Sequence, residues 1–149
     1  MQVTGGRLAY LYLGTPDVRR AAAFYVSALG AEVVWAFDRF GARVAALRIG
    51  DGPLLLLADH RPAGECRLLY RVDDISAAVA ELRAAGATDL LEIGVPPGPC
   101  VICDDAAGNP IGVIEETRPG RMEAGFASAD NSAALRPPWP FDDVGDERG

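Results

Sequence analysis

Residues 8–20 read LAYLYLGTPDVRR, and the same pattern returns at residues 65–77 as ECRLLYRVDDISA. In both stretches a strand-like run leads to an acidic residue, Asp17 or Asp74, at the start of an alanine-rich segment. An aspartate in that place caps a helix, because its carboxylate accepts hydrogen bonds from the free amides of the first turn. Each alanine-rich segment ends at a Gly-Ala pair, and glycine suits the left-handed end of a helix. The sequence therefore predicts one module used twice.

Hydrophobic periodicity predicts the other elements of this module. Both helices have apolar residues at a spacing of three and four. These residues are Val18, Ala22, Tyr25, Val26 and Leu29 in the first helix and Ile75, Val79, Leu82 and Ala85 in the second. Strand-like runs follow at 32–37, 43–49 and 54–57 after the first helix, and at 89–93, 100–103 and 111–116 after the second. The predicted fold class is α+β, with two βαβββ modules.

The short motifs that connect the predicted strands and helices resemble those of the vicinal oxygen chelate superfamily. This superfamily includes glyoxalase I, extradiol dioxygenases and bleomycin-binding proteins. The matching text is TPDV at 15–18, GDGPL at 50–54, VDDI at 72–75 and DDAAGNPI at 104–111. Each phrase is short, and their order and spacing together make the resemblance specific. It covers residues 7–117.

The resemblance implies a cup-shaped mixed sheet with helices on its outer face. A domain of residues 1–117 would contain module one at about 7–58, a linker at 59–65 and module two at about 66–117. Residues 118–149 lose all periodicity and are rich in proline, glycine and acidic residues, which predicts an extended or disordered tail. The aromatic run PPWPF at 137–141 leaves two alternatives. The tail is either pinned to its own domain or strapped across a partner subunit or a pocket.

Superfamily members hold a divalent metal with His, Glu or Gln at four strand positions, two in each module. The resemblance places these positions at Tyr10, Leu55, Arg67 and Gly112. Leucine and glycine side chains cannot bind metal, arginine is a cation, and neutral tyrosine is a poor ligand for the usual ions. The single histidine, His60, lies in the linker. We therefore expect no metal and no cofactor.

The composition limits the class of protein. The 149 residues carry a formal net charge of −7, and 50% of them are hydrophobic, which allows a single domain with a sizeable core. This charge would repel a phosphate backbone, so nucleic acid is not an expected partner. No apolar run approaches the roughly 20 residues of a membrane span, and residues 1–7 lack the pattern of a signal peptide. We expect no membrane partner and a cytoplasmic location.

The three cysteines cannot all pair with one another. Cys100 and Cys103 form a C-x-x-C, the spacing of many zinc and redox sites. They lie in a predicted strand, on which positions three apart point to opposite faces, and the chain has no second C-x-x-C. The favoured interpretation is a pair of buried thiols, with a zinc site as the alternative.

Strand alternation predicts which side chains line the cup. If Tyr10 and Arg67 point inward, Tyr12, Leu69 and Arg71 point inward from the same strands. The full predicted ligand-binding set is Tyr10, Tyr12, Trp35, Phe37, Phe40, Leu55, Leu57, Arg67, Leu69, Arg71, Gly112 and Ile114. This mixture suits a flat, largely apolar ligand that carries a few polar or anionic groups. The alternative is a closed core in which Arg67 pairs with Glu116 or Asp59.

Three functions are compatible with such a cup. The favoured one is a metal-independent protein, not an enzyme, that sequesters an aromatic or polycyclic natural product or antibiotic, as bleomycin-resistance proteins do. The second is a glyoxalase-like lyase, isomerase or dioxygenase-type enzyme that acts on a small oxygenated substrate. Its candidate catalytic residues are Tyr10, Tyr12 and His60, because a tyrosine beside an arginine can have a lowered pKa and move protons. The third is an interaction protein that binds another chain through its tail. The resemblance also implies a homodimer.

Overall fold

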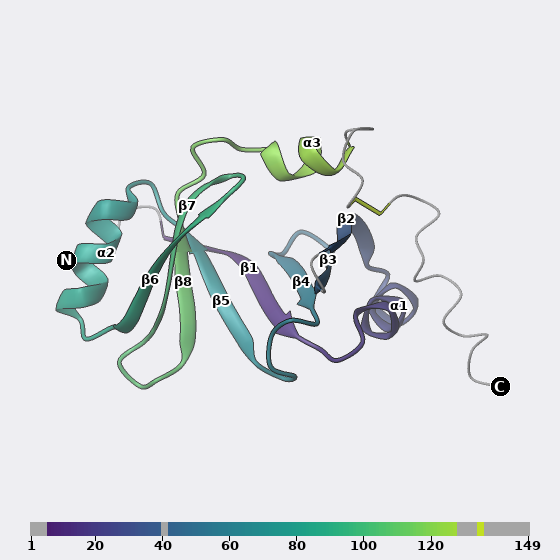
Figure 1. Cartoon of the computed structure of the whole chain (residues 1–149), viewed down its shortest axis with the longest axis horizontal. Helices are drawn as coiled ribbons and strands as arrows, with labels where there is room; N and C mark the ends of the chain where they lie inside the picture. The colour runs from purple at the N-terminus through teal and green to yellow at the C-terminus, as the bar shows by residue number, and fades with distance from the viewer. Residues whose placement is uncertain (1–5, 40–41, 128–133, 136–149) are drawn as a thin grey trace. The chain divides into compact units, whose positions relative to one another are not determined.

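The computed structural model describes residues 6–39, 42–127 and 134–135 (Figure 1). The elements in chain order are β1 (Arg7–Gly14), α1 (Val18–Leu29), β2 (Glu32–Arg39), β3 (Ala42–Arg48), β4 (Leu54–Ala58), β5 (Cys66–Arg71), α2 (Ile75–Ala84), β6 (Thr88–Val95), β7 (Gly98–Asp104), β8 (Pro110–Ile114) and α3 (Arg121–Ala127). The order βαβββ occurs twice, so the predicted α+β class is confirmed. None of the helices in these ranges is long and apolar enough to cross a membrane.

The chain divides into two compact units. One unit contains Met1–Tyr10 and Cys66–Met122, and the other contains Leu11–Glu65 and Glu123–Gly149. The units follow the two predicted modules, except that β1 contributes residues to both. The predicted extended tail is wrong in one part, because residues 121–127 form the helix α3. At its other described part the tail is pinned to its own unit, since Ala134 forms an antiparallel bridge with Phe37 of β2.

Both predicted helix starts are confirmed by the geometry of their caps. The Asp17 carboxylate accepts a hydrogen bond from the Arg20 amide at 3.0 Å, and the Asp74 carboxylate accepts one from the Ala77 amide at 3.1 Å. The helix α1 ends at Gly30, whose φ of 67° lies in the left-handed region that glycine enters without strain. These local signals explain why both helices begin at the residues that the sequence indicates.

The unit built on module one packs α1 against β2, β3 and β4, which lie in the order β2-β3-β4 with antiparallel pairing. Its core cluster consists of Val18, Ala22, Ala31, Val33, Ala36, Ala45, Leu47, Leu55 and Leu57. Leu29, predicted on the buried face of α1, is instead 55% exposed. It is the last residue of the helix.

The unit built on module two contains four strands in the order β5-β8-β7-β6. The strands β5 and β8 are parallel, whereas β7 pairs antiparallel with both β8 and β6. The sheet is therefore mixed, as predicted. The helix α2 contacts β7 and β8, and Val72, Ala78, Val101 and Val113 form the core beneath it. The Ile75 amide at the start of α2 donates to the Glu115 carboxylate at 2.9 Å, which ties the helix to the end of β8.

The three cysteines are free thiols. Cys66 is exposed at the start of β5, whereas Cys100 and Cys103 are buried in β7. The buried-thiol interpretation of the C-x-x-C is therefore confirmed. Burial raises the pKa of Cys100 to about 11, against an opposing effect of the Arg67 charge, and burial also raises the pKa of Cys103.

We expect iodoacetamide to label Cys66 first when the native protein is treated near neutral pH. The reagent attacks the thiolate, and Cys100 combines burial with a raised pKa, so it should react at least about tenfold more slowly than Cys66. Mass spectrometry of peptides from native and denatured samples measures the order of labelling. Faster labelling of Cys100 than of Cys66 in the native protein would contradict the placement of β7.

Candidate functional site

Two side chains of one unit meet at a third, that of Glu116, which lies two residues beyond the end of β8. The Tyr10 hydroxyl, from β1, donates to Glu116 Oε1 at 2.7 Å, and Arg71 Nη2, from β5, donates to the same oxygen at 2.9 Å. The Glu116 side chain is 14% exposed and that of Arg71 is 42% exposed. No residue in the described ranges donates to the second oxygen, Oε2. We call these three residues the Glu116 cluster.

The electrostatics of the Glu116 cluster keep Tyr10 protonated. Burial raises the pKa of Tyr10 well above its usual range, and the hydrogen bond and negative charge of Glu116 raise it further, while Arg71 opposes them. The expectation that a neighbouring arginine lowers the pKa of the tyrosine is therefore wrong for Tyr10, because desolvation and Glu116 outweigh the positive charge of Arg71. For Arg71, burial lowers the pKa, but the hydrogen bond and charge of Glu116 prevail and raise it. Arg71 Nε is buried and has no hydrogen-bond partner among the described residues.

The raised pKa of Tyr10 makes stability fall with pH in the alkaline range. An unfolded tyrosine loses its proton near pH 10, whereas Tyr10 in the folded protein keeps it. In this range the folded state binds more protons than the unfolded state. The contribution of Tyr10 to the free energy of unfolding is therefore complete below about pH 10 and is lost as the pH rises further. We expect Tyr10→Phe to flatten the dependence of the unfolding free energy on pH above about pH 10, in urea titrations. Tyr70→Phe is the matched control, and an equal flattening in it would contradict the assignment.

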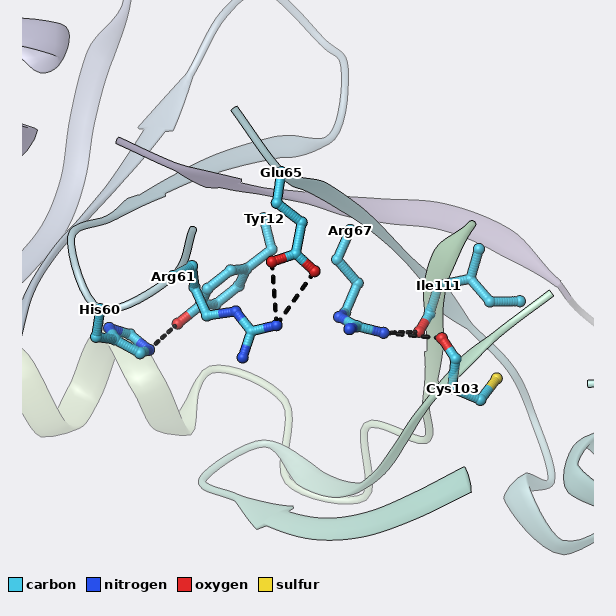
Figure 2. A network of polar contacts seen from close by, with 7 residues as sticks. All are labelled: Tyr12, His60, Arg61, Glu65, Arg67, Cys103 and Ile111. Carbon is cyan, nitrogen blue, oxygen red and sulfur yellow. Dashed lines mark hydrogen bonds and ion pairs between the residues drawn. The ribbon is translucent and has the colours of Figure 1, made fainter. Parts of the chain in front are cut away.

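The other unit contains a second polar cluster, formed by Tyr12 and by residues of the segment between β4 and β5. The Tyr12 hydroxyl lies 3.1 Å from His60 Nε2, and Arg61 Nη2 lies 3.3 Å from Glu65 Oε1. Figure 2 shows the two pairs side by side. The Tyr12 and His60 rings meet edge to face. Burial raises the pKa of Tyr12, and the Arg61 charge opposes the rise. We call these four residues the linker cluster.

Gly14 fixes the linker against the end of β1. The Gly14 amide donates to the Glu65 carbonyl at 2.8 Å, and the Gly14 carbonyl accepts from the Gly64 amide at 3.0 Å. A Cβ atom at Gly14 would overlap the Pro62 carbonyl oxygen and lie 2.9 Å from that of Arg61. Only glycine therefore allows the linker to approach the strand this closely.

Arg67, at a position where the resemblance expects a metal ligand, binds backbone oxygens instead. Its Nη1 donates to the carbonyls of Cys103 and Ile111, each at 2.8 Å (Figure 2). These two residues face each other across the β7–β8 pair. The guanidinium thus joins β5 to its neighbour β8 and to β7, the strand beyond β8. Arg71, not Arg67, is the residue that pairs with Glu116.

The other three metal-ligand positions do not fit a divalent ion either. The Tyr10 hydroxyl is bonded to Glu116, and Leu55 is 8% exposed within the core of its own unit. Gly112 has no side chain that could bind a metal, and a Cβ atom there would lie 2.6 Å from Leu69 Cδ2. Among residues 6–39, 42–127 and 134–135, no three His, Cys, Asp or Glu side chains form a group that could hold a metal ion.

The rest of the predicted ligand-binding set is largely buried. Trp35 is 4% exposed and stacks on Phe37 with ring centroids 6.3 Å apart. Leu57, Leu69 and Ile114 are buried, and Phe40 lies outside the described residues. A ligand-binding role for these residues stays a prediction.

The sequence offered Glu116 as a possible partner of Arg67 in a closed core, and not among the ligand-binding or catalytic residues. The sequence signal that indicates Glu116 is the pair of adjacent acids, Glu115 and Glu116, directly after β8. The two carboxylates have different partners. Glu115 binds the first turn of α2, whereas Glu116 binds Tyr10 and Arg71. The two adjacent acids point to different partners, as neighbouring residues on an extended chain do.

Comparison with known proteins gives three findings. Residues 10–114 match the family described as Glyoxalase-like domain. The human mitochondrial methylmalonyl-CoA epimerase is 32% identical over a match that covers 55% of this chain and 58% of that protein. The chain thus spans less than two thirds of this relative's length.

Solved structures of bacterial epimerases share the fold. Methylmalonyl-CoA epimerase from Mycobacterium tuberculosis superposes with a TM-score of 0.64 at 19% identity, over 78% of this chain and 93% of the other. The epimerase of Streptomyces coelicolor, in complex with 2-nitronate-propionyl-CoA, gives 0.62 at 18% identity, over 78% of this chain and 99% of the other.

These relatives correct the expected function. The prediction of an antibiotic-sequestering binding protein is wrong, because the named relatives are epimerases, which are enzymes. The alternative of an isomerase-type enzyme acting on a small oxygenated substrate agrees better with them. The Streptomyces coelicolor enzyme also binds a small ligand, 2-nitronate-propionyl-CoA.

Proposed function

Because the chain belongs to the family of glyoxalase-like domains, we propose that it is an enzyme of the isomerase or lyase kind that moves a proton on a small oxygenated substrate. The substrate class is a carboxylic acid or its thioester, which is the class named in the epimerase relatives. The metal-ligand positions carry residues that do not fit a metal, so the reaction is assigned to side chains of this chain.

The observation that supports this proposal best is the arrangement at Glu116. One carboxylate oxygen, Oε1, accepts from both Tyr10 and Arg71, while Oε2 has no donor among the described residues. A carboxylate held in this way has a fixed direction and keeps one oxygen available to accept a proton. Fixed geometry of this kind is what general base catalysis requires.

Each member of the cluster has a separate role in the proposed reaction. Glu116 Oε2 takes the proton from the carbon next to the substrate carbonyl, and the electrons of that C–H bond move to the carbonyl oxygen. The half-exposed Arg71 guanidinium stabilises the negative charge that develops on this oxygen. Tyr10 stays protonated because its pKa is raised, so it donates a hydrogen bond to Glu116 and keeps that carboxylate oriented. Tyr10 is therefore not itself the base. Return of a proton to the carbon restores the carbonyl.

Exchange of the substrate's α-proton in deuterated water tests this function. The full-length protein is incubated with methylmalonyl-CoA, methylmalonic acid or propionyl-CoA, and the α-proton signal is followed by NMR against a sample without protein. We expect exchange of at least one compound to be faster than in the blank. Exchange at the blank rate for all three would overturn the proposed substrate class.

A further inference from the structure

The strand β2 forms one edge of its unit. It is the last strand in the order β2-β3-β4 and pairs antiparallel with β3 on its inner side. Its sequence, EVVWAFDR, is largely apolar in the middle. An edge strand presents unpaired amides and carbonyls on its outer side, and these groups can bind another extended segment.

A short piece of the tail occupies this outer edge. Ala134 forms an antiparallel bridge with Phe37, and the Leu135 amide donates to the Ala36 carbonyl at 2.9 Å. Figure 1 shows this piece, coloured yellow, beside β2. The Leu135 side chain is partly buried and packs against the core cluster under α1. Both the backbone and the side chain of Leu135 therefore hold the tail in place.

The sequence after Leu135 does not favour a longer strand. The five residues that follow in the sequence are Arg136, Pro137, Pro138, Trp139 and Pro140. Proline has no amide hydrogen to donate, so three of these five residues cannot add a ladder bond. Proline-rich sequence is therefore poorly suited to extend the pairing that Ala134 and Leu135 make.

We propose that Ala134–Leu135 is an edge cap, which occupies the strand-docking surface of β2 and prevents that surface from pairing with a second copy of the chain. The docked segment runs antiparallel to β2, so the edge accepts an antiparallel strand. The β2 strand of a second copy meets the same requirement, because antiparallel pairing of identical strands is symmetric and brings the same apolar residues together. Release of the cap is therefore expected to produce self-association.

The first test is hydrogen exchange of the full-length protein. The Leu135 amide is bonded to the Ala36 carbonyl, so it should exchange at least about tenfold more slowly than an unstructured amide of the same sequence. Exchange at the unstructured rate would overturn the proposal, because the cap would then not be closed in solution.

The second test is the assembly state of full-length variants, measured by light scattering over a range of concentrations. Leu135→Asp removes the apolar contact, and Leu135→Pro removes the amide donor and keeps an apolar side chain. Leu29→Asp, the same chemical change at a residue that is 55% exposed on α1, is the matched control. We expect both Leu135 variants, and not the control, to associate at least about tenfold more tightly than the unsubstituted chain. Folded Leu135 variants with unchanged association would overturn the proposal, and circular dichroism establishes that they are folded.

Discussion

Replacing Glu116 by glutamine is expected to lower the rate of α-proton exchange by a factor of about 10² to 10⁴. The amide has nearly the same shape as the carboxylate, and its oxygen can still accept from Tyr10 and Arg71, which now bind Oε1 at 2.7 and 2.9 Å. It cannot accept the substrate's proton. The rate should therefore fall while substrate binding changes little, and NMR exchange rates at several substrate concentrations separate the two effects.

The matched control for this variant is Glu92→Gln. Glu92 lies on β6, is exposed and carries the same charge, so its replacement changes the net charge equally without touching the Glu116 cluster. We expect it to keep the exchange rate of the unsubstituted protein. If Glu116→Gln exchanged the α-proton within about twofold of the unsubstituted rate, Glu116 would not be the base.

Gly14→Ala is expected to lower the free energy of unfolding by about 3 kcal/mol. The added methyl would overlap the Pro62 carbonyl oxygen and press on the Arg61 carbonyl oxygen at 2.9 Å. Both are backbone atoms, so the clash is relieved only if the linker moves away and breaks its hydrogen bonds with Gly14. Urea unfolding followed by circular dichroism measures the loss.

Gly94→Ala serves as the control for this loss. Gly94 lies on β6, and apart from its two chain neighbours no described residue comes within 4 Å of the Cβ atom that alanine would add. We expect the unfolding free energy of this variant to stay within about 0.5 kcal/mol of the unsubstituted protein. An equal loss in both variants would mean that the close approach of Pro62 does not explain the effect at Gly14.

Much of the fold could be predicted because its signals are local. Asp17 and Gly30 act through hydrogen bonds and backbone angles within one helical turn, so a few residues define each end of α1. The helix α3 was missed because its stretch, RMEAGFA, has only seven residues and contains a glycine, so it is too short to show a repeated apolar pattern. The division of β1 between two units depends on contacts between distant residues, which no local pattern records.

The candidate site was predicted only in part. Strand alternation correctly placed Tyr10 and Arg71 together, because it assigns side chains to faces of a strand. It could not decide which of two arginines on the same face of β5 pairs with Glu116. In the structure Arg67 binds two carbonyls and Arg71 binds the carboxylate. It also could not weigh burial against charge, and this balance decides the protonation of Tyr10.

The parallel pairing of β5 with β8 affects how the chain is made. Leu68 is paired with Ile111, and α2, β6 and β7 lie between them in the sequence. A ribosome releases the chain from its N-terminus at roughly 5–20 residues per second, so β5 emerges on the order of seconds before β8 is complete. During this interval the nascent chain exposes a strand whose neighbour has not yet been translated. The edge of β5 that pairs with β8 therefore stays open on the nascent chain until β8 has been synthesised.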